Sequence, residues 1–163
     1  MYKLGTTRFN TSTWDENKQY RIKMEHRGCI YGTPKQIKED ITLHLPIFVL
    51  EMQNDVNKIM GIGLIRNAIV IGTRHTIYSD LFYNRYTYKS NFRIDRKELD
   101  KNETKLIKIL DILVFKGYHH LKRGQGITIV PPWITNSKKI NFIKHFREMF
   151  RKRFYENDDN QDK

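Results

Sequence analysis

Two apolar runs near the middle of the chain restrict the fold more than any other feature. Residues 47–50 and 59–65 are mostly aliphatic or aromatic, and residues 54–58 between them are turn formers. Apolar runs of this length, bounded by turn residues, are typical of buried strands. Residues 47–65 therefore predict a buried β-hairpin around which the rest of the chain is organised.

Two glycines interrupt the second of these runs. Gly61 and Gly63 lie two residues apart, so both face the same side of a strand. Strand interiors accept glycine where the strand bends or where another group approaches closely. We expect a packed helix or a ligand to approach the chain at these two positions.

The flanking segments carry both helical and strand patterns. Capping residues and apolar side chains at helical spacing predict helices over residues 14–26, 34–43, 97–116 and 138–155, with Asn102 as an alternative cap for the third. Strands are predicted over residues 29–31, 68–71, 83–94 and 127–130. The strands cluster in the middle of the chain. This order indicates an α+β fold with a mixed or antiparallel sheet flanked by helices, and a small barrel is one form that such a sheet can take.

Length and cysteine content limit the class of protein. The 163 residues suit one globular domain, residues 1–155, followed by an acidic tail, residues 156–163, which we expect to be disordered. Cys29 is the single cysteine, so the chain forms no internal disulfide and no cysteine-based zinc site. A reducing intracellular compartment is expected, the cytoplasm or a virion. No stretch has the pattern of a signal peptide or a transmembrane span.

The charge balance indicates the class of partner. Lys and Arg number 30 against 18 Asp and Glu, which gives a formal net charge of +12. An excess of this size favours binding to a polyanion. A membrane surface fits less well, because no long basic amphipathic helix stands apart from the core pattern. We expect a nucleic-acid partner, RNA rather than DNA.

Aromatic and basic residues are interleaved in several segments. Aromatic rings stack on bases while Lys and Arg neutralise phosphates, a combination that single-stranded RNA recognition uses. Two facing rings would also form a cage for a methylated or cationic base. The predicted stacking or cage residues are Tyr86, Tyr88 and Trp133, followed by Trp14 and Tyr31. The predicted phosphate contacts are Lys89, Arg93, Lys122, Arg123 and Arg151.

A second candidate is the basic loop of residues 119–126. Gly124 and Gly126 allow close backbone approach, and Lys122 and Arg123 attract phosphate. The loop lacks the GK[ST] ending of a phosphate-binding Walker loop. It therefore predicts general phosphate contact rather than nucleotide hydrolysis.

Metal and hydrolytic patterns are weaker. The six histidines form no HExxH or comparable pair, so no cofactor, metal or catalytic residue is predicted. Glu51, Asp80 and Asp95 form the alternative hypothesis, a metal-dependent nuclease. Cys29 near His26 is expected to be a buried apolar residue rather than a nucleophile.

Residues 31–65 resemble the PUA-like group, which includes the EVE and YTH domains. The resemblance lies in a strand and turn followed by a second strand with glycines at positions like Gly61 and Gly63. It implies a small barrel flanked by helices and recognition of RNA or modified nucleotides in an aromatic pocket. The basic C-terminal helix departs from that pattern. The richness in Asn, Lys, Ile and Tyr also resembles proteins of large DNA viruses.

The leading hypothesis is a non-enzymatic RNA-binding module. Its ligand would be a modified nucleotide or a methylated 5′ cap, held by an aromatic pocket with a basic rim. A structural or packaging protein of a virion, which uses its charge without sequence preference, is the alternative beside the nuclease.

Overall fold

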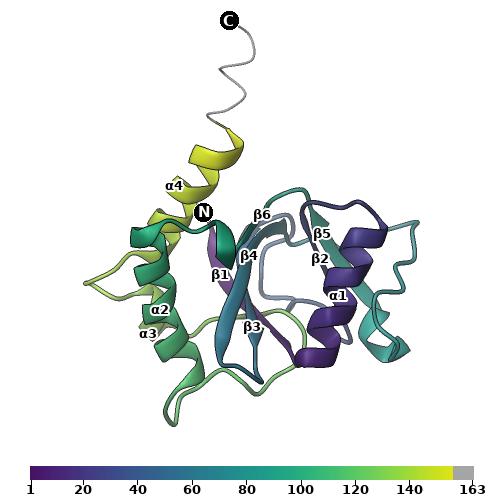
Figure 1. Cartoon of the computed structure of the whole chain (residues 1–163), viewed down its shortest axis with the longest axis horizontal. Coiled ribbons are helices and arrows are strands. Elements are labelled where there is room, and N and C mark those ends of the chain that lie inside the picture. The colour runs from purple at the N-terminus through teal and green to yellow at the C-terminus, as the bar shows by residue number, and fades with distance from the viewer. Residues whose placement is uncertain (156–163) are drawn as a thin grey trace, which may run out of the picture.

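The computed structural model describes residues 1–155, and a mixed sheet lies at its centre (Figure 1). Five strands follow the order β6-β4-β3-β1-β7, and β1 pairs with β3 in parallel while the other pairs are antiparallel. A separate pair is formed by β2 and β5. The strands are β1 (Lys3–Phe9), β2 (Cys29–Thr33), β3 (Pro46–Gln53), β4 (Lys58–Arg66), β5 (Tyr86–Ser90), β6 (Arg93–Asp95) and β7 (Thr128–Ile129).

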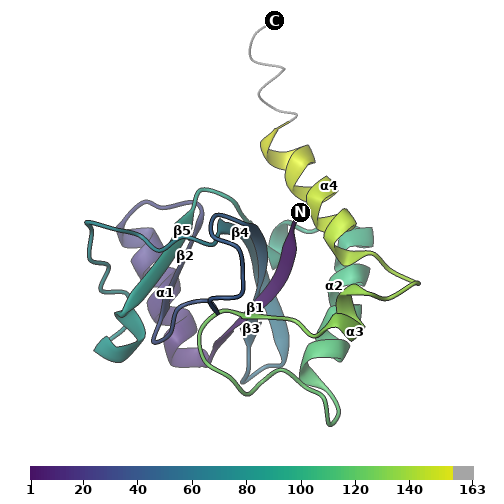
Figure 2. The same ribbon diagram turned by 180° about the vertical axis from the view of Figure 1, so that it is seen from behind.

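Helices cover the central sheet from one side, and α1 lies with the strand pair on the other. In Figures 1 and 2, α2, α3 and α4 gather beside the sheet, and α1 lies next to β2 and β5. The helices are α1 (Thr11–Lys23), α2 (Lys101–Phe115), α3 (Pro132–Thr135) and α4 (Phe142–Phe154). None of these described helices is both long and apolar enough to cross a membrane.

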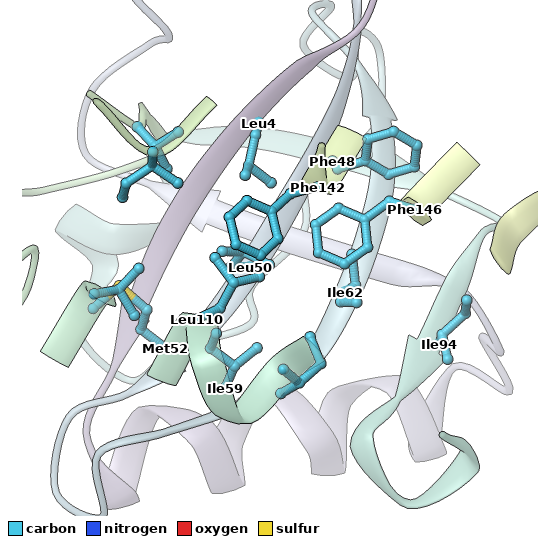
Figure 3. Close-up of a cluster of buried hydrophobic side chains, with 14 of the residues drawn as sticks. Leu4, Phe48, Leu50, Met52, Ile59, Ile62, Ile94, Leu110, Phe142 and Phe146 are labelled. Carbon is cyan, nitrogen blue, oxygen red and sulfur yellow. The ribbon is translucent and has the colours of Figure 1, made fainter. Parts of the chain in front are cut away.

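Two apolar clusters explain why the central strands are apolar on both faces. Phe48 and Leu50 of β3 pack with the helices, and Figure 3 shows Phe142 and Phe146 of α4 lying against them. Ile47 and Val49 alternate with these residues and pack toward β2 and α1. A strand covered on both faces carries a continuous apolar run rather than an alternating one.

The predicted α+β fold with a mixed sheet is confirmed, and so is the central hairpin, formed by β3 and β4. The first predicted helix is also present, although it begins at Thr11 with Asn10 as its cap. The predicted third helix begins at Lys101, capped by Asp100 rather than Asn102. The predicted last helix begins at Phe142.

Three expectations about the fold of the described residues are wrong. Residues 34–43 form an irregular loop, because Ile37 donates its N–H to the Tyr88 hydroxyl and the Thr33 hydroxyl donates to the Lys35 carbonyl instead of capping a helix. Residues 68–71 form no strand. The sheet stays open, with β6 and β7 at its edges, and does not close into a barrel. The predicted acidic tail lies outside the described residues.

Candidate functional site

A cavity of about 250 Å³ opens where β1 ends, and we call it the strand-end cavity. Because β1 and β3 run in parallel, their carboxyl ends meet at the same edge of the sheet. The start of α1 and the loop of residues 121–126 complete the walls. The lining residues are Thr7, Arg8, Phe9, Asn10, Thr13, Gly32, Pro34, Asn54, Tyr78, Tyr83, Lys122, Gly124, Gln125 and Gly126.

Arg8 fixes the loop against the sheet. Its Nε donates to the Leu121 carbonyl at 2.5 Å, and Nη1 donates to the Gly126 carbonyl at 3.3 Å. Its Nη2 donates to the hydroxyls of Thr6 and Thr128. Burial lowers the pKa of the Arg8 guanidinium to about 10, so it remains charged at neutral pH. Among the described residues no carboxylate forms a salt bridge with this cation, so its charge favours an anion nearby.

Asn54 lies in the turn between β3 and β4 and contacts the same loop. Its backbone N–H donates to the Phe9 carbonyl at 2.8 Å, and its Nδ2 donates to the Lys122 carbonyl at 3.0 Å. Its Oδ1 is buried without a hydrogen-bond partner in the described chain. The Lys122 carbonyl fixes this orientation, because exchanging the amide atoms would place two acceptors together. A buried acceptor without a donor costs about 1–3 kcal/mol, which a donor on a ligand would offset.

The start of α1 forms another wall. Asn10 accepts from the Thr13 backbone N–H at 2.8 Å, and the Thr13 hydroxyl accepts from the Asn10 N–H at 3.0 Å. Asp55 accepts from the backbone N–H and the hydroxyl of Thr11, and these two bonds lower the pKa of its carboxyl. The positive end of the helix dipole therefore lies at the cavity with its first N–H groups already bonded.

The basic loop is the part of the sequence-based prediction that reaches this cavity. Lys122, Gly124 and Gly126 line it, whereas Arg123 is exposed and does not. Gly124 has φ +131°, and a Cβ at that position would lie 3.3 Å from Cζ of Arg8. Only glycine combines this backbone conformation with the close contact to the guanidinium.

Gly61 and Gly63 belong to a different part of the molecule. A Cβ at Gly61 would meet the Arg93 guanidinium and Oε1 of Glu51, and one at Gly63 would meet the Tyr31 hydroxyl. Side chains from neighbouring strands therefore make the close approach, and the expectation of a helix or a ligand at these positions is wrong.

Arg93 and Tyr31 are bonded to a buried carboxylate. Arg93 binds Glu51 at 2.7 Å and Asp95 at 3.0 Å, and the Tyr31 hydroxyl donates to Glu51 at 2.6 Å. Burial alone lowers the pKa of Arg93, but the charge and hydrogen bonds of Glu51 raise it overall. The geometry gives both residues a structural role, and neither lines the strand-end cavity.

The other predicted aromatic residues are dispersed. Tyr88 is buried, and its hydroxyl accepts from the Ile37 N–H. Trp14 packs edge-on against Phe9 at 5.3 Å between ring centroids, and Tyr86 has the Arg85 guanidinium over its ring. Trp133 is 48% exposed on α3. The predicted cage is therefore not assembled from these residues. The rings that line the cavity are Phe9, Tyr78 and Tyr83.

Two predicted phosphate contacts lie away from the cavity. Lys89 is exposed on β5, and Arg151 is exposed on α4. Neither lines the cavity.

The three carboxylates of the nuclease alternative have other contacts. Glu51 and Asp95 both bind Arg93, and Asp80 accepts from the Phe82 N–H at the start of a short 3₁₀ helix, Leu81–Asn84. Within residues 1–155 no group of three or more His, Cys, Asp or Glu side chains is placed to hold a metal ion. Glu51 and Asp95 are thus brought together around an arginine.

Sequence reasoning missed Arg8, Asn54, Phe9 and Tyr78, whereas Tyr83 belongs to the aromatic stretch that it had singled out. The sequence carries no clear signal for either polar residue, since Arg8 lies in the polar segment 1–10 and Asn54 lies among turn formers. No protein-family model, curated protein or solved structure matches the chain. The PUA-like resemblance therefore stays a prediction.

Proposed function

We propose that the protein binds single-stranded RNA and takes one base into the strand-end cavity. One observation carries the proposal: Asn54, whose Oδ1 is buried without a hydrogen-bond partner in the described chain, lines a cavity together with Arg8 and Lys122. None of the described lining residues is Asp or Glu. The site is therefore suited to a ligand that combines an N–H donor with negative charge, as a nucleotide does.

The size and lining of the cavity support a single base. Its volume of about 250 Å³ lies below the range of about 300–1,000 Å³ that is usual for drug-sized ligands. Asn10, Thr13 and Gln125 are among the lining residues. Base edges carry donors and acceptors that match amide and hydroxyl side chains. An exocyclic amine or a ring N–H of the base would donate to Oδ1 of Asn54.

A methylated base or a methylated 5′ cap is the finer proposal. Phe9, Tyr78 and Tyr83 supply aromatic surface to the cavity, and the rings of Tyr78 and Tyr83 meet edge to face at 6.3 Å. A methyl group on the base gains favourable contact with such rings, and a cationic base gains more. This refinement separates a reader of modified RNA from a general RNA-binding protein.

The test is a fluorescence-anisotropy titration at two salt concentrations. It compares plain single-stranded RNA, duplex DNA and RNA that carries methyladenosine or a methylated cap. We expect single-stranded RNA to bind more tightly than duplex DNA at both salt concentrations. A preference for one methylated ligand that persists at high salt would support the finer proposal.

Neighbouring loop residues provide matched variants for this titration. Lys122→Ala removes a cation that lines the cavity, and Arg123→Ala removes an exposed cation beside it. We expect Lys122→Ala to weaken RNA binding about tenfold and Arg123→Ala to weaken it less, since a charge near a desolvated site acts more strongly than an exposed one. Equal, small effects with binding that collapses at high salt would support the packaging alternative instead.

A further inference from the structure

A second groove lies at the opposite end of β1, beside α4, and we call it the α4 groove. It has a volume of about 460 Å³, and Figures 1 and 2 both place the amino end of β1 beside α4. Aromatic rings form its floor, since Tyr2 stacks on Phe48 at 5.3 Å and Phe48 contacts Phe150 at 5.3 Å. Phe48 and Phe150 are fully buried, so the floor is held by the core.

Cations of α4 line one wall of the groove. Lys144 and Arg147 are exposed and lie three residues apart, on the same face of the helix. The Arg147 guanidinium lies 4.7 Å from the centroid of the Tyr2 ring. Arg151 lines the same groove, and Glu148 is the one carboxylate among its described lining residues. No described carboxylate forms a salt bridge with Lys144 or Arg147, so both are available to a phosphate.

Tyr155 adds an aromatic platform at the end of the groove. Its ring stacks on Phe92 with centroids 5.9 Å apart and planes inclined by 29°. The side chain is nevertheless 53% exposed. A ring that is oriented by a neighbour and still accessible can stack on a base, and cations beside it can follow the phosphates.

We propose that the α4 groove is a second contact for the same RNA strand. This inference rests on the proposed function and extends it to the path of the ligand. The groove begins at Tyr2 and the strand-end cavity begins at Thr7. Five residues of an extended strand span about 17 Å. The two sites also lie on opposite faces of the sheet, so the RNA must pass round a sheet edge. A dodecamer is long enough for this path, whereas a trinucleotide in the cavity is not.

The test is binding of two single-stranded RNAs, a trinucleotide and a dodecamer, to the double variant Lys144→Ala/Arg147→Ala. Each lost phosphate contact lowers the salt slope for single strands by about 0.7, so the dodecamer should lose about 1.4. Between 50 and 200 mM salt, the affinity of the unmodified protein should fall about sevenfold more than that of the variant. Trinucleotide binding should be unchanged.

Two controls keep the comparison specific. Lys101→Ala/Lys108→Ala removes the same charge from exposed positions of α2 that do not line the groove. The salt slope of its dodecamer binding should stay nearer to that of the unmodified protein. Tyr155→Ala should weaken dodecamer binding about fivefold or more, and Tyr155→Phe should not, because it keeps the stacking ring. Circular dichroism confirms that each variant is folded.

The outcomes separate the two proposals. If both double variants bind the dodecamer alike, the α4 groove is not a specific contact and the inference is wrong. The proposed function still holds in that case if Lys122→Ala weakens trinucleotide binding. If the α4 variant weakens the dodecamer and Lys122→Ala has no effect on the trinucleotide, the cavity proposal fails and the groove stands. If Lys144→Ala/Arg147→Ala loses binding to vesicles of anionic lipid but keeps its RNA binding, the inference is wrong and the α4 groove contacts a membrane surface instead.

Discussion

Removing the Arg93 side chain should destabilise the protein strongly. The side chains of Arg93 and Glu51 are only 5% and 2% exposed to solvent. Nε and Nη2 of Arg93 both donate hydrogen bonds to the Glu51 carboxylate. In Arg93→Ala, Glu51 keeps one described hydrogen bond, from the Tyr31 hydroxyl. Its buried negative charge then has no cation in contact with it.

The expected loss is about 3–5 kcal/mol, the usual cost of breaking a buried ion pair by removing one partner. Urea unfolding at neutral pH, followed by circular dichroism, measures it. With a denaturant slope near 2 kcal/mol per molar, the unfolding midpoint should fall by about 1.5–2.5 M. Because typical domains are stable by only about 5–15 kcal/mol, this change is a large fraction of the total.

A double variant separates the buried charge from the lost packing. Glu51→Gln/Arg93→Met removes both charges and fills part of the space, so it should be more stable than Arg93→Ala by at least about 1 kcal/mol. Arg66→Ala is the control, since its bond to the His44 carbonyl is exposed, and it should change stability by less than about 0.5 kcal/mol. A loss below about 1 kcal/mol in Arg93→Ala would refute the argument that this pair is desolvated.

Two further results are expected. Burial raises the pKa of the Cys29 thiol to about 11. A thiol reagent at pH 8 should therefore modify the native protein far more slowly than the urea-unfolded chain. Equal rates of modification would contradict the buried position of Cys29. Arg8→Met removes the hydrogen bonds to the Leu121 and Gly126 carbonyls, so trypsin should cut after Lys122 or Arg123 faster than in the unmodified protein. Unchanged cutting would show that Arg8 does not hold the loop.

The central elements could be predicted because their signals are local. The runs that form β3 and β4 are continuously apolar since both faces of these strands are covered. The loop over residues 34–43 could not be predicted, because the Tyr88 hydroxyl, 51 residues away, binds the Ile37 N–H. A distant side chain therefore overrides a local capping pattern.

The candidate site was predicted only in part for the same reason. Lys122, Gly124 and Gly126 stand out as a basic, glycine-containing loop, but Asn54 resembles any turn residue. Its importance comes from the parallel pairing of β1 with β3, which brings Asn54 to Phe9 and Lys122. Tyr31 and Tyr88 were predicted to stack on bases, but both are buried where β2 and β5 pack against the sheet. The residues next to them in the sequence do not reveal this burial.

The position of β1 between β3 and β7 has a consequence for synthesis on the ribosome. The hydroxyls of Thr6 and Thr128 can form their hydrogen bond only after 122 further residues have been synthesised. At about 5–20 residues per second, this delay lasts about 6–24 seconds. During that interval one edge of the first strand is unpaired and Arg8 lacks its partners at Leu121 and Gly126. The strand-end cavity therefore cannot form until residues 121–129 have been synthesised.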